Sequence, residues 1–169
     1  MSEHDDSDFS RAAAETLRSL GAEPVVIGGI AAIRFRAVPR MTTDIDFLIR
    51  SHVEGIEEAF RAAGFEVRAL QNAADQPYLY LIRGGGDVRI DVLVADTEYQ
   101  TEAFDRAVDG FLTPEDVIVH KLIAWRGRDQ DDIRSILDAG HALDESYIRR
   151  WADEWDVADR WREANGSPD

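Results

Sequence analysis

Residues 25–49 read VVIGGIAAIRFRAVPRMTTDIDFLI, and this stretch decides the fold. The β-branched run Pro24–Ile27 predicts a short buried strand that leads directly into the pair Gly28-Gly29. Residues 30–35 predict a helix, Pro39 ends that region, and residues 43–49 predict a second strand. The order strand, glycine pair, helix, strand indicates an α/β fold.

Two carboxylates lie in the second of these strands. Side chains alternate along a strand, so Asp44 and Asp46 point to the same face, roughly 6–7 Å apart, while Ile45 and Phe47 point to the other. Two carboxylates on one face of an otherwise apolar strand are costly to bury unless a cation lies between them. A hard cation with oxygen ligands, Mg²⁺ or Mn²⁺, is the expected partner.

Asp91 repeats this pattern as an isolated acid in the strand-like run VRIDVLV. A third carboxylate on a neighbouring strand would complete a site for two metal ions. Gly28 and Gly29 would let backbone N–H groups approach a triphosphate at the start of a helix. A glycine pair is usually a plain turn and a D-x-D is usually a solvated strand edge, but their ordered combination with Asp91 favours a site for a metal and a nucleoside triphosphate (NTP).

The rest of the chain divides into two parts. Helices are expected at residues 10–20, 52–63 and 97–108, strands at 65–70, 78–82 and 88–94, a hairpin turn at 84–87, and an acidic tail at 1–8. Thr113-Pro114 is a strong helix start, and the chain then reads as helical to about residue 163, with breaks near Gly127, Gly140 and Asp156. We therefore predict a mixed, twisted sheet flanked by helices over residues 10–110 and a C-terminal helical cap over 113–165, packed on that core. The spacing of Trp151, Trp155 and Trp161 suits core packing, or else a contact with a partner.

Composition narrows the function. The 169 residues carry 34 acidic and 19 basic side chains, a net charge of −15, so most of the surface repels nucleic acid and any polyanion needs a local basic patch. The absence of cysteine excludes disulfides and thiol catalysis. No apolar run approaches the roughly 18 residues of a membrane span. The acidic start is unlike a secretory signal, so a cytoplasmic protein is expected.

Arginine supplies 18 of the basic residues and lysine one. This bias fits a GC-rich genome or a salt-adapted proteome, and it makes Lys121 stand out. A candidate basic patch that could steer an NTP or an RNA end comprises Arg34, Arg36, Arg40, Arg126 and Arg128. Surface ion pairing with the abundant acids is the alternative interpretation of these arginines.

The segments VVIGGIAA and PRMTTDIDFLI resemble the nucleotidyltransferase superfamily of the DNA polymerase β type. The later segment EDVIVHKLIAWRGRDQDDI, residues 115–133, is similar to a helical segment of the AbiEii-type toxins of type IV toxin–antitoxin systems. The resemblance covers about residues 22–140. Many superfamily members have Ser after the first glycine, where this chain has Gly29, so only the backbone would be available there.

The resemblance implies a role for each candidate residue. Asp44, Asp46 and Asp91 would hold Mg²⁺ or Mn²⁺, and Asp91 would also be the general base for the incoming hydroxyl. Gly28, Gly29 and Lys121 would contact the NTP phosphates, with Arg40 in the nucleotide-binding set. Asp129 and Asp132 would belong to the family's last acidic motif.

The resemblance also implies metal-dependent transfer of a nucleoside monophosphate (NMP) from an NTP to a hydroxyl, with release of pyrophosphate. An RNA acceptor, the tRNA 3′ end first, and an antitoxin protein as partner are expected for a toxin of that type. Alternatives are a protein or small-molecule hydroxyl as acceptor, or a catalytically silent binding or antitoxin module. A D-x-D glycosyltransferase or a phosphohydrolase is disfavoured, because the glycine pair precedes the D-x-D at superfamily-like spacing.

Overall fold

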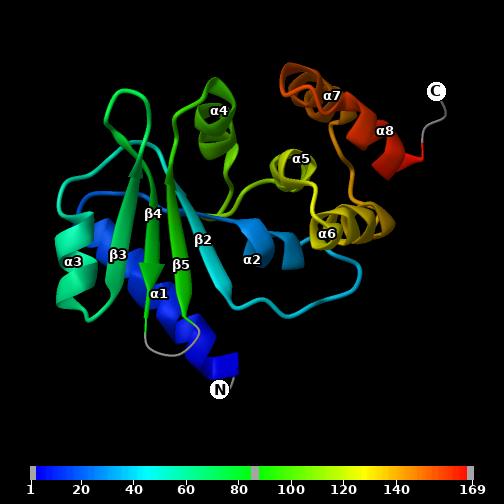
Figure 1. The fold of residues 1–169 in the computed structure, drawn as a ribbon. Helices are drawn as coiled ribbons and strands as arrows, with labels where there is room; N and C mark the ends of the chain where they lie inside the picture. Colours follow the sequence, from blue (N-terminus) through cyan, green and yellow to red (C-terminus); the bar gives the residue numbers. More distant parts are fainter. Residues whose placement is uncertain (1–2, 85–87, 167–169) are drawn as a thin grey trace.

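A five-stranded mixed sheet forms the centre of the protein (Figure 1). The computed structural model describes residues 3–84 and 88–166, with side chains from residue 9 onward. The strands are β1 (Val25–Ile27), β2 (Asp44–Ile49), β3 (Glu66–Gln71), β4 (Pro77–Arg83) and β5 (Arg89–Val94). Their order across the sheet is β1-β2-β5-β4-β3; β2 and β5 are parallel and the other neighbours are antiparallel. The predicted α/β class with a mixed sheet is confirmed.

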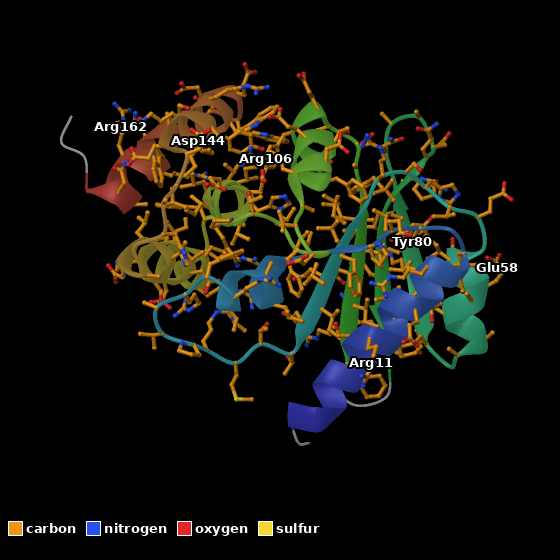
Figure 2. The ribbon with its side chains drawn as sticks, turned by 180° about the vertical axis from the view of Figure 1, so that it is seen from behind. Arg11, Glu58, Tyr80, Arg106, Asp144 and Arg162 are labelled. Carbon is orange, nitrogen blue, oxygen red and sulfur yellow. The ribbon has the colours of Figure 1, made fainter. Side chains whose placement is uncertain are left out.

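Eight helices are present in the described residues: α1 (Glu3–Ser19), α2 (Gly28–Ile33), α3 (Ile56–Ala62), α4 (Glu98–Arg106), α5 (Pro114–Ala124), α6 (Gly127–Asp138), α7 (Glu145–Glu154) and α8 (Ala158–Asn165). Helices α1 and α3 cover one face of the sheet, as the view from behind in Figure 2 shows. Helices α2, α4 and α5 lie at the β1–β2 side, and α6 to α8 lie beyond them (Figure 1). None of the described helices is both long and apolar enough to cross a bilayer.

Two apolar clusters stabilise this arrangement. One lies between the sheet and α1 and α3, and includes Leu17, Phe47, Phe60 and Ile90. The other joins β1, α2 and Leu48 of β2 to α4 and to the four C-terminal helices. Trp151 and Trp161 belong to this second cluster, whereas Trp155 is 36% exposed. Residues from both predicted parts therefore share one core, and the division near residue 110 stays an interpretation of the sequence.

Several predicted boundaries were wrong. Helix α1 begins at Glu3, so most of the expected acidic tail is helical. Helix α2 begins at Gly28, so the glycine pair belongs to the helix itself. Helix α3 begins only at Ile56, because Gly55 before it has φ +87°. Three of the four residues of the predicted 84–87 turn lie outside the described residues.

The start of the C-terminal helices is confirmed. The Thr113 hydroxyl accepts a hydrogen bond from the Asp116 N–H at 3.3 Å, and Pro114 follows as the first helical residue. The break predicted near Gly127 comes two residues earlier, where Trp125 adopts a left-handed φ of +50° and ends α5. Gly127 is then the first residue of α6.

Asp116 is a fully buried carboxylate at the junction of α4, α5 and α7. It accepts hydrogen bonds from the Tyr147 hydroxyl at 2.6 Å, the Thr113 hydroxyl at 2.7 Å and Arg106 Nε at 3.2 Å. Burial raises the pKa of Asp116, and these three donors act in the opposite direction. A buried carboxylate needs such donors, because an unpaired one costs several kcal/mol. Asp116 thus ties the C-terminal helices to α4 through polar contacts as well as apolar ones.

We predict that Tyr147→Phe lowers the free energy of unfolding by about 1–3 kcal/mol, because it leaves the buried Asp116 carboxylate one donor short. The measurement is urea unfolding followed by circular dichroism. Tyr78→Phe is the control: this half-buried tyrosine has no hydrogen bond from its hydroxyl within the described residues. Equal stability of the two variants would contradict the role given to the Tyr147 hydroxyl.

Candidate functional site

The sheet register brings the three predicted carboxylates onto one face. Asp46 in β2 is the lateral partner of Asp91 in β5, and Asp44 is the partner of Arg89. Because β2 and β5 are parallel and in register, the side chains of Asp44, Asp46 and Asp91 project to the same side. Ile45, on the opposite side, is buried in the core with α1 and α3.

The glycine pair lies directly against Asp46. Gly28 has φ +65°, and a Cβ added there would overlap with the Asp46 carboxylate. The backbone N–H of Gly29 donates a hydrogen bond to the same carboxylate. Only glycine fits at residue 28, because any side chain would be strained by φ and would collide with Asp46.

Asp46 is in an unfavourable electrostatic environment. Burial raises its pKa to about 6, and the charges of Asp91 and Asp44 act in the same direction. The Lys121 ammonium and the Gly29 N–H oppose this rise. Asp46 therefore has more negative charge around it than nearby positive charge compensates.

The other two carboxylates have arginine partners. Arg83 Nη1 lies 2.7 Å from Asp91 Oδ1, and Arg128 Nη1 lies 3.7 Å from Asp44 Oδ2. In residues 3–84 and 88–166, no group of three or more Asp, Glu, His or Cys side chains is arranged to hold a metal ion as it stands. The chemistry of the donor set nevertheless fits a hard divalent cation, because three carboxylates share one face and crowd one another. Arg83 and Arg128 are partners that the sequence did not indicate, since only the register brings them to these acids.

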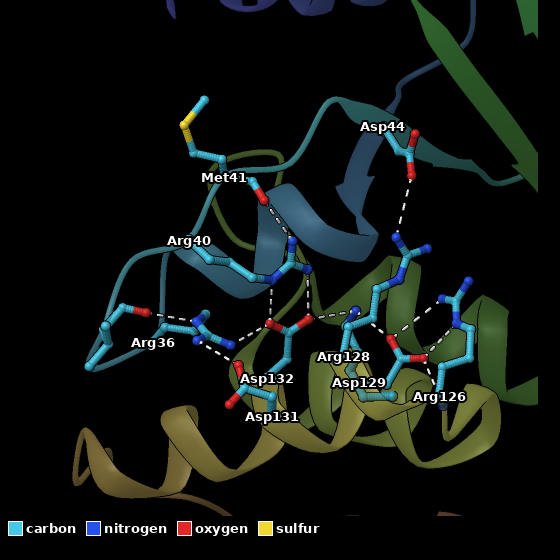
Figure 3. A network of polar contacts seen from close by, with 11 residues as sticks. Arg36, Arg40, Met41, Asp44, Arg126, Arg128, Asp129, Asp131 and Asp132 are labelled. Carbon is cyan, nitrogen blue, oxygen red and sulfur yellow. Dashed lines mark hydrogen bonds and ion pairs between the residues drawn. The ribbon is translucent and has the colours of Figure 1, made fainter. Parts of the chain in front are cut away.

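A buried ion-pair network adjoins the carboxylates (Figure 3). Lys121 Nζ lies 2.8 Å from Asp129 Oδ1 and 2.9 Å from Asp132 Oδ2. The Lys121 side chain is 6% exposed, and both carboxylates are fully buried. Lys121 thus connects α5 to α6, and contact with a phosphate would require it to leave one of these partners. Its phosphate role stays a prediction.

The same network ties the loop before β2 to α6. Arg40 binds Asp132 through Nε at 2.7 Å and Nη2 at 2.8 Å, and Arg36 Nη1 lies 2.5 Å from the same carboxylate. Although burial acts to raise it, hydrogen bonds from Arg40 and Lys121 hold the pKa of Asp132 well below its usual range. The network places Arg40 beside the glycine pair: a Cβ added at Gly29 would lie 3.1 Å from Arg40 Nη2.

The predicted basic patch is largely neutralised. Arg36 and Arg40 pair with Asp132, and Arg126 Nε lies 2.7 Å from Asp129 Oδ2. Arg34 lies apart from this network, 3.7 Å from Asp109. The alternative interpretation of these arginines, ion pairing with acidic side chains, therefore agrees with the structure. Thr42 is a neighbour of Gly29 that the sequence did not indicate; its Oγ1 would lie 2.9 Å from an added Cβ.

We predict that Gly28→Ala destabilises the protein more than Gly21→Ala. Both residues have positive φ, so the backbone strain is matched, but only at residue 28 does the new methyl group meet a side chain, the Asp46 carboxylate. The measurement is the difference in urea midpoint at constant m-value. If both variants lose the same stability, the close approach of Gly28 to Asp46 is wrong.

A second prediction concerns Lys121. Lys121→Met should lower the free energy of unfolding by about 3 kcal/mol, because it leaves two buried carboxylates without their shared cation while Arg40 and Arg126 remain. The control is Asp131→Asn, which breaks the ion pair of Arg36 with a 59% exposed carboxylate and should cost less than about 1 kcal/mol. A Lys121→Met protein as stable as this control would show that the buried ion pairs contribute nothing to folding.

Solved structures share this fold. The antibiotic-resistance factor ANT(2'')-Ia is 17% identical, covers 95% of each chain and superposes with a TM-score of 0.56. A nucleotidyltransferase candidate from H. pylori is 16% identical over 99% of this chain and 79% of its own, with a TM-score of 0.54. The protein JHP933 from Helicobacter pylori is 16% identical over 100% and 86%, with a TM-score of 0.52. At these identities the likeness establishes the fold alone.

The sequence was also compared with known protein families and with curated proteins. Among curated proteins, none matches it significantly. Residues 7–156 match the family described as nucleotidyl transferase of unknown function (DUF2204). That match includes both carboxylate strands, the glycine pair and the Lys121 network. Because it spans most of the chain, the protein belongs to this nucleotidyl transferase family.

Proposed function

We propose that this protein is a metal-dependent nucleotidyltransferase that moves an NMP from an NTP to a hydroxyl. In this reaction the acceptor oxygen forms a bond to the α-phosphorus, the bond to the β-phosphate oxygen breaks, and pyrophosphate leaves. The observation that carries the proposal is the lateral pairing of Asp46 with Asp91, with Gly28 and Gly29 packed against Asp46. Membership of the nucleotidyl transferase family supports it.

Asp44, Asp46 and Asp91 are the residues that would hold Mg²⁺ or Mn²⁺. Such ions, when bound, neutralise phosphate charge and orient the reacting oxygens. Burial, together with the charges of Asp91 and Asp44, raises the pKa of Asp46, and a bound cation would stabilise its charged form. Asp91 lies at the open side of β5, 36% exposed, and its carboxylate is proposed to take the proton of the acceptor hydroxyl.

The nucleotide phosphates are proposed to bind beside Gly28 and Gly29, next to the Asp46 carboxylate. Arg40 is held beside Gly29 by Asp132 and has 22% of its side chain exposed, so it can contact a phosphate without leaving its partner. Asp129 and Asp132 would act indirectly, by positioning the side chains of Arg40, Lys121 and Arg126. Lys121 would reach a phosphate only by exchanging Asp129 or Asp132 for it.

An RNA 3′ end, with tRNA first, is the proposed acceptor, and the resemblance to AbiEii-type toxins suggests a toxin with an antitoxin partner. A protein hydroxyl or a small-molecule hydroxyl is the alternative acceptor. The antibiotic-resistance factor, 95% of whose length this chain covers, has a similar fold.

A second candidate function is a catalytically silent binding module. Two observations favour it: Asp91 and Asp44 already have arginine partners, and no metal group is formed as the described residues stand. Titration with Mn²⁺ in the presence of NTP separates the two candidates, because a silent module would bind no Mn²⁺ at this site.

We predict that the wild-type protein with Mg²⁺, α-labelled NTP and total RNA transfers label to an acceptor and releases pyrophosphate. Asp44→Asn and Asp46→Asn should each abolish transfer while leaving the fold at least as stable, because each removes a crowded negative charge. Asp91→Asn should lower the rate on the order of 100-fold or more with little change in NTP affinity. Asp131→Asn, outside the site, is the control, and near-normal turnover of Asp46→Asn would refute the proposal.

A further inference from the structure

The register of the sheet defines three rows of side chains on the face that carries the carboxylates. Each row runs across β3, β4, β5 and β2, and is given by the printed strand partners. The first row is Glu66, Arg83, Arg89, Asp44; the second is Arg68, Leu81, Asp91, Asp46; the third is Leu70, Leu79, Leu93, Leu48. The half of this face on β3 to β5 therefore carries three arginines above a row of leucines, next to the candidate site.

None of the helices in the described residues covers this half of the face. Figure 1 looks onto it, and no helix lies in front of β3 and β4, whereas Figure 2, from behind, shows α1 across the opposite face. Leu70, Leu79 and Leu81 are only half-buried and belong to neither apolar cluster. Tyr80 and Ile82, which alternate with them in β4, are buried against α1 and α3. These half-buried leucines beside the candidate site offer an apolar surface on which a ligand can pack.

Two of the three arginines on this surface have no acidic partner within the described residues. Most arginines of the described residues are in ion pairs, despite the large excess of acids. Arg68 and Arg89 are exposed and form no ion pair within residues 3–84 and 88–166, and Arg83 is 38% exposed. Three cations thus face solvent within two strands of Asp91, on a protein whose net charge is −15.

From this geometry we infer that the open face of β3–β5 is the docking surface for the acceptor, and that Arg68, Arg83 and Arg89 hold the phosphate backbone of an RNA strand. The inference rests on the proposed function and adds the place and the chemistry of the acceptor. A strand that crosses the three arginines reaches Asp91, which lies in the row next to Arg89 and beside Asp46. Leu70, Leu79 and Leu81 give its bases an apolar surface.

The side chains on this face discriminate between acceptor classes. Arg68 and Arg89 have no acidic partner within the described residues, so they attract phosphates and repel cations, whereas Arg83 shares its charge with Asp91. Sequence-specific reading of bases relies on aromatic stacking or on hydrogen bonds to base edges, and the rows on β3–β5 contain no aromatic residue and no amide. The surface therefore suits a backbone-held strand with little sequence preference.

The test measures RNA binding without catalysis. Fluorescence anisotropy of a labelled single-stranded RNA, with Mg²⁺ and without NTP, is compared for wild type, R68Q/R89Q and R18Q/R134Q. The control pair removes the same charge from exposed arginines on α1 and α6, away from the open face. R68Q/R89Q should bind on the order of ten-fold more weakly at low salt. Its log Kd against log salt slope should be shallower by about 1.4, at about 0.7 per lost phosphate contact.

The control pair should bind as the wild type does, apart from a small general charge effect. If both double variants bind RNA equally weakly, the inference is wrong, because only net charge would then matter. The inference is also wrong if the wild-type protein binds no RNA at low salt. These results are independent of the proposed function, which label transfer tests. The protein could instead transfer label to a small molecule or a protein while its RNA binding does not depend on Arg68 and Arg89. That result would support the proposed enzymatic function and refute the RNA-docking surface.

Discussion

The parallel pairing of β2 with β5 is the constraint on which the candidate site depends. It sets Asp46 beside Asp91, so two carboxylates share one position on the sheet face with Asp44 one row away. A shift of one residue would send Asp91 into the apolar core against α1 and α3, where Ile90 and Val92 now lie. The apolar residues on the other face thus fix the register, and the register in turn forces like charges together.

The buried network around Asp132 is the second requirement. Ser135 accepts hydrogen bonds from the Ala37 and Val38 N–H groups and so holds the middle of the loop from residue 34 to 43, while the Asp132 network fixes Arg40 beside Gly29. Asp132 of α6 receives Arg36 and Arg40 from the loop and Lys121 from α5, so one carboxylate fixes the loop, α5 and α6 together. Breaking such a pair leaves a buried charge uncompensated, which makes the arrangement rigid even where its net contribution to stability is small.

Local signals in the sequence predicted much of the fold. β-branched runs located β1 and β2, alternation placed Asp44 and Asp46 on one face, and Thr113-Pro114 marked the start of α5. The burial of Lys121 could not be predicted, because two of the arginines that share its partner Asp132 lie more than 80 residues earlier in the chain. The pairing of Arg83 with Asp91 depends on the register between β4 and β5, which no local pattern contains. The burial of Lys121 and the pairing of Arg83 with Asp91 therefore depend on contacts between distant segments, which sequence periodicity does not reveal.

The net charge of the protein disfavours an anionic ligand, whereas the arginines near Asp91 favour one. Which effect is larger depends on how far each charge lies from the ligand. At physiological ionic strength the Debye length is about 8 Å, so exposed acids farther away than this are largely screened. Arg83 lies 2.7 Å from Asp91, and Arg89 is two residues from Asp91 along β5, about 6.8 Å at about 3.4 Å per residue, so both arginines lie within that length. A strand of nucleic acid at this face therefore responds to the arginines and to the charge state of the three carboxylates, not to the total of −15. Neutralising those carboxylates is then the step that turns the face from mixed to positive.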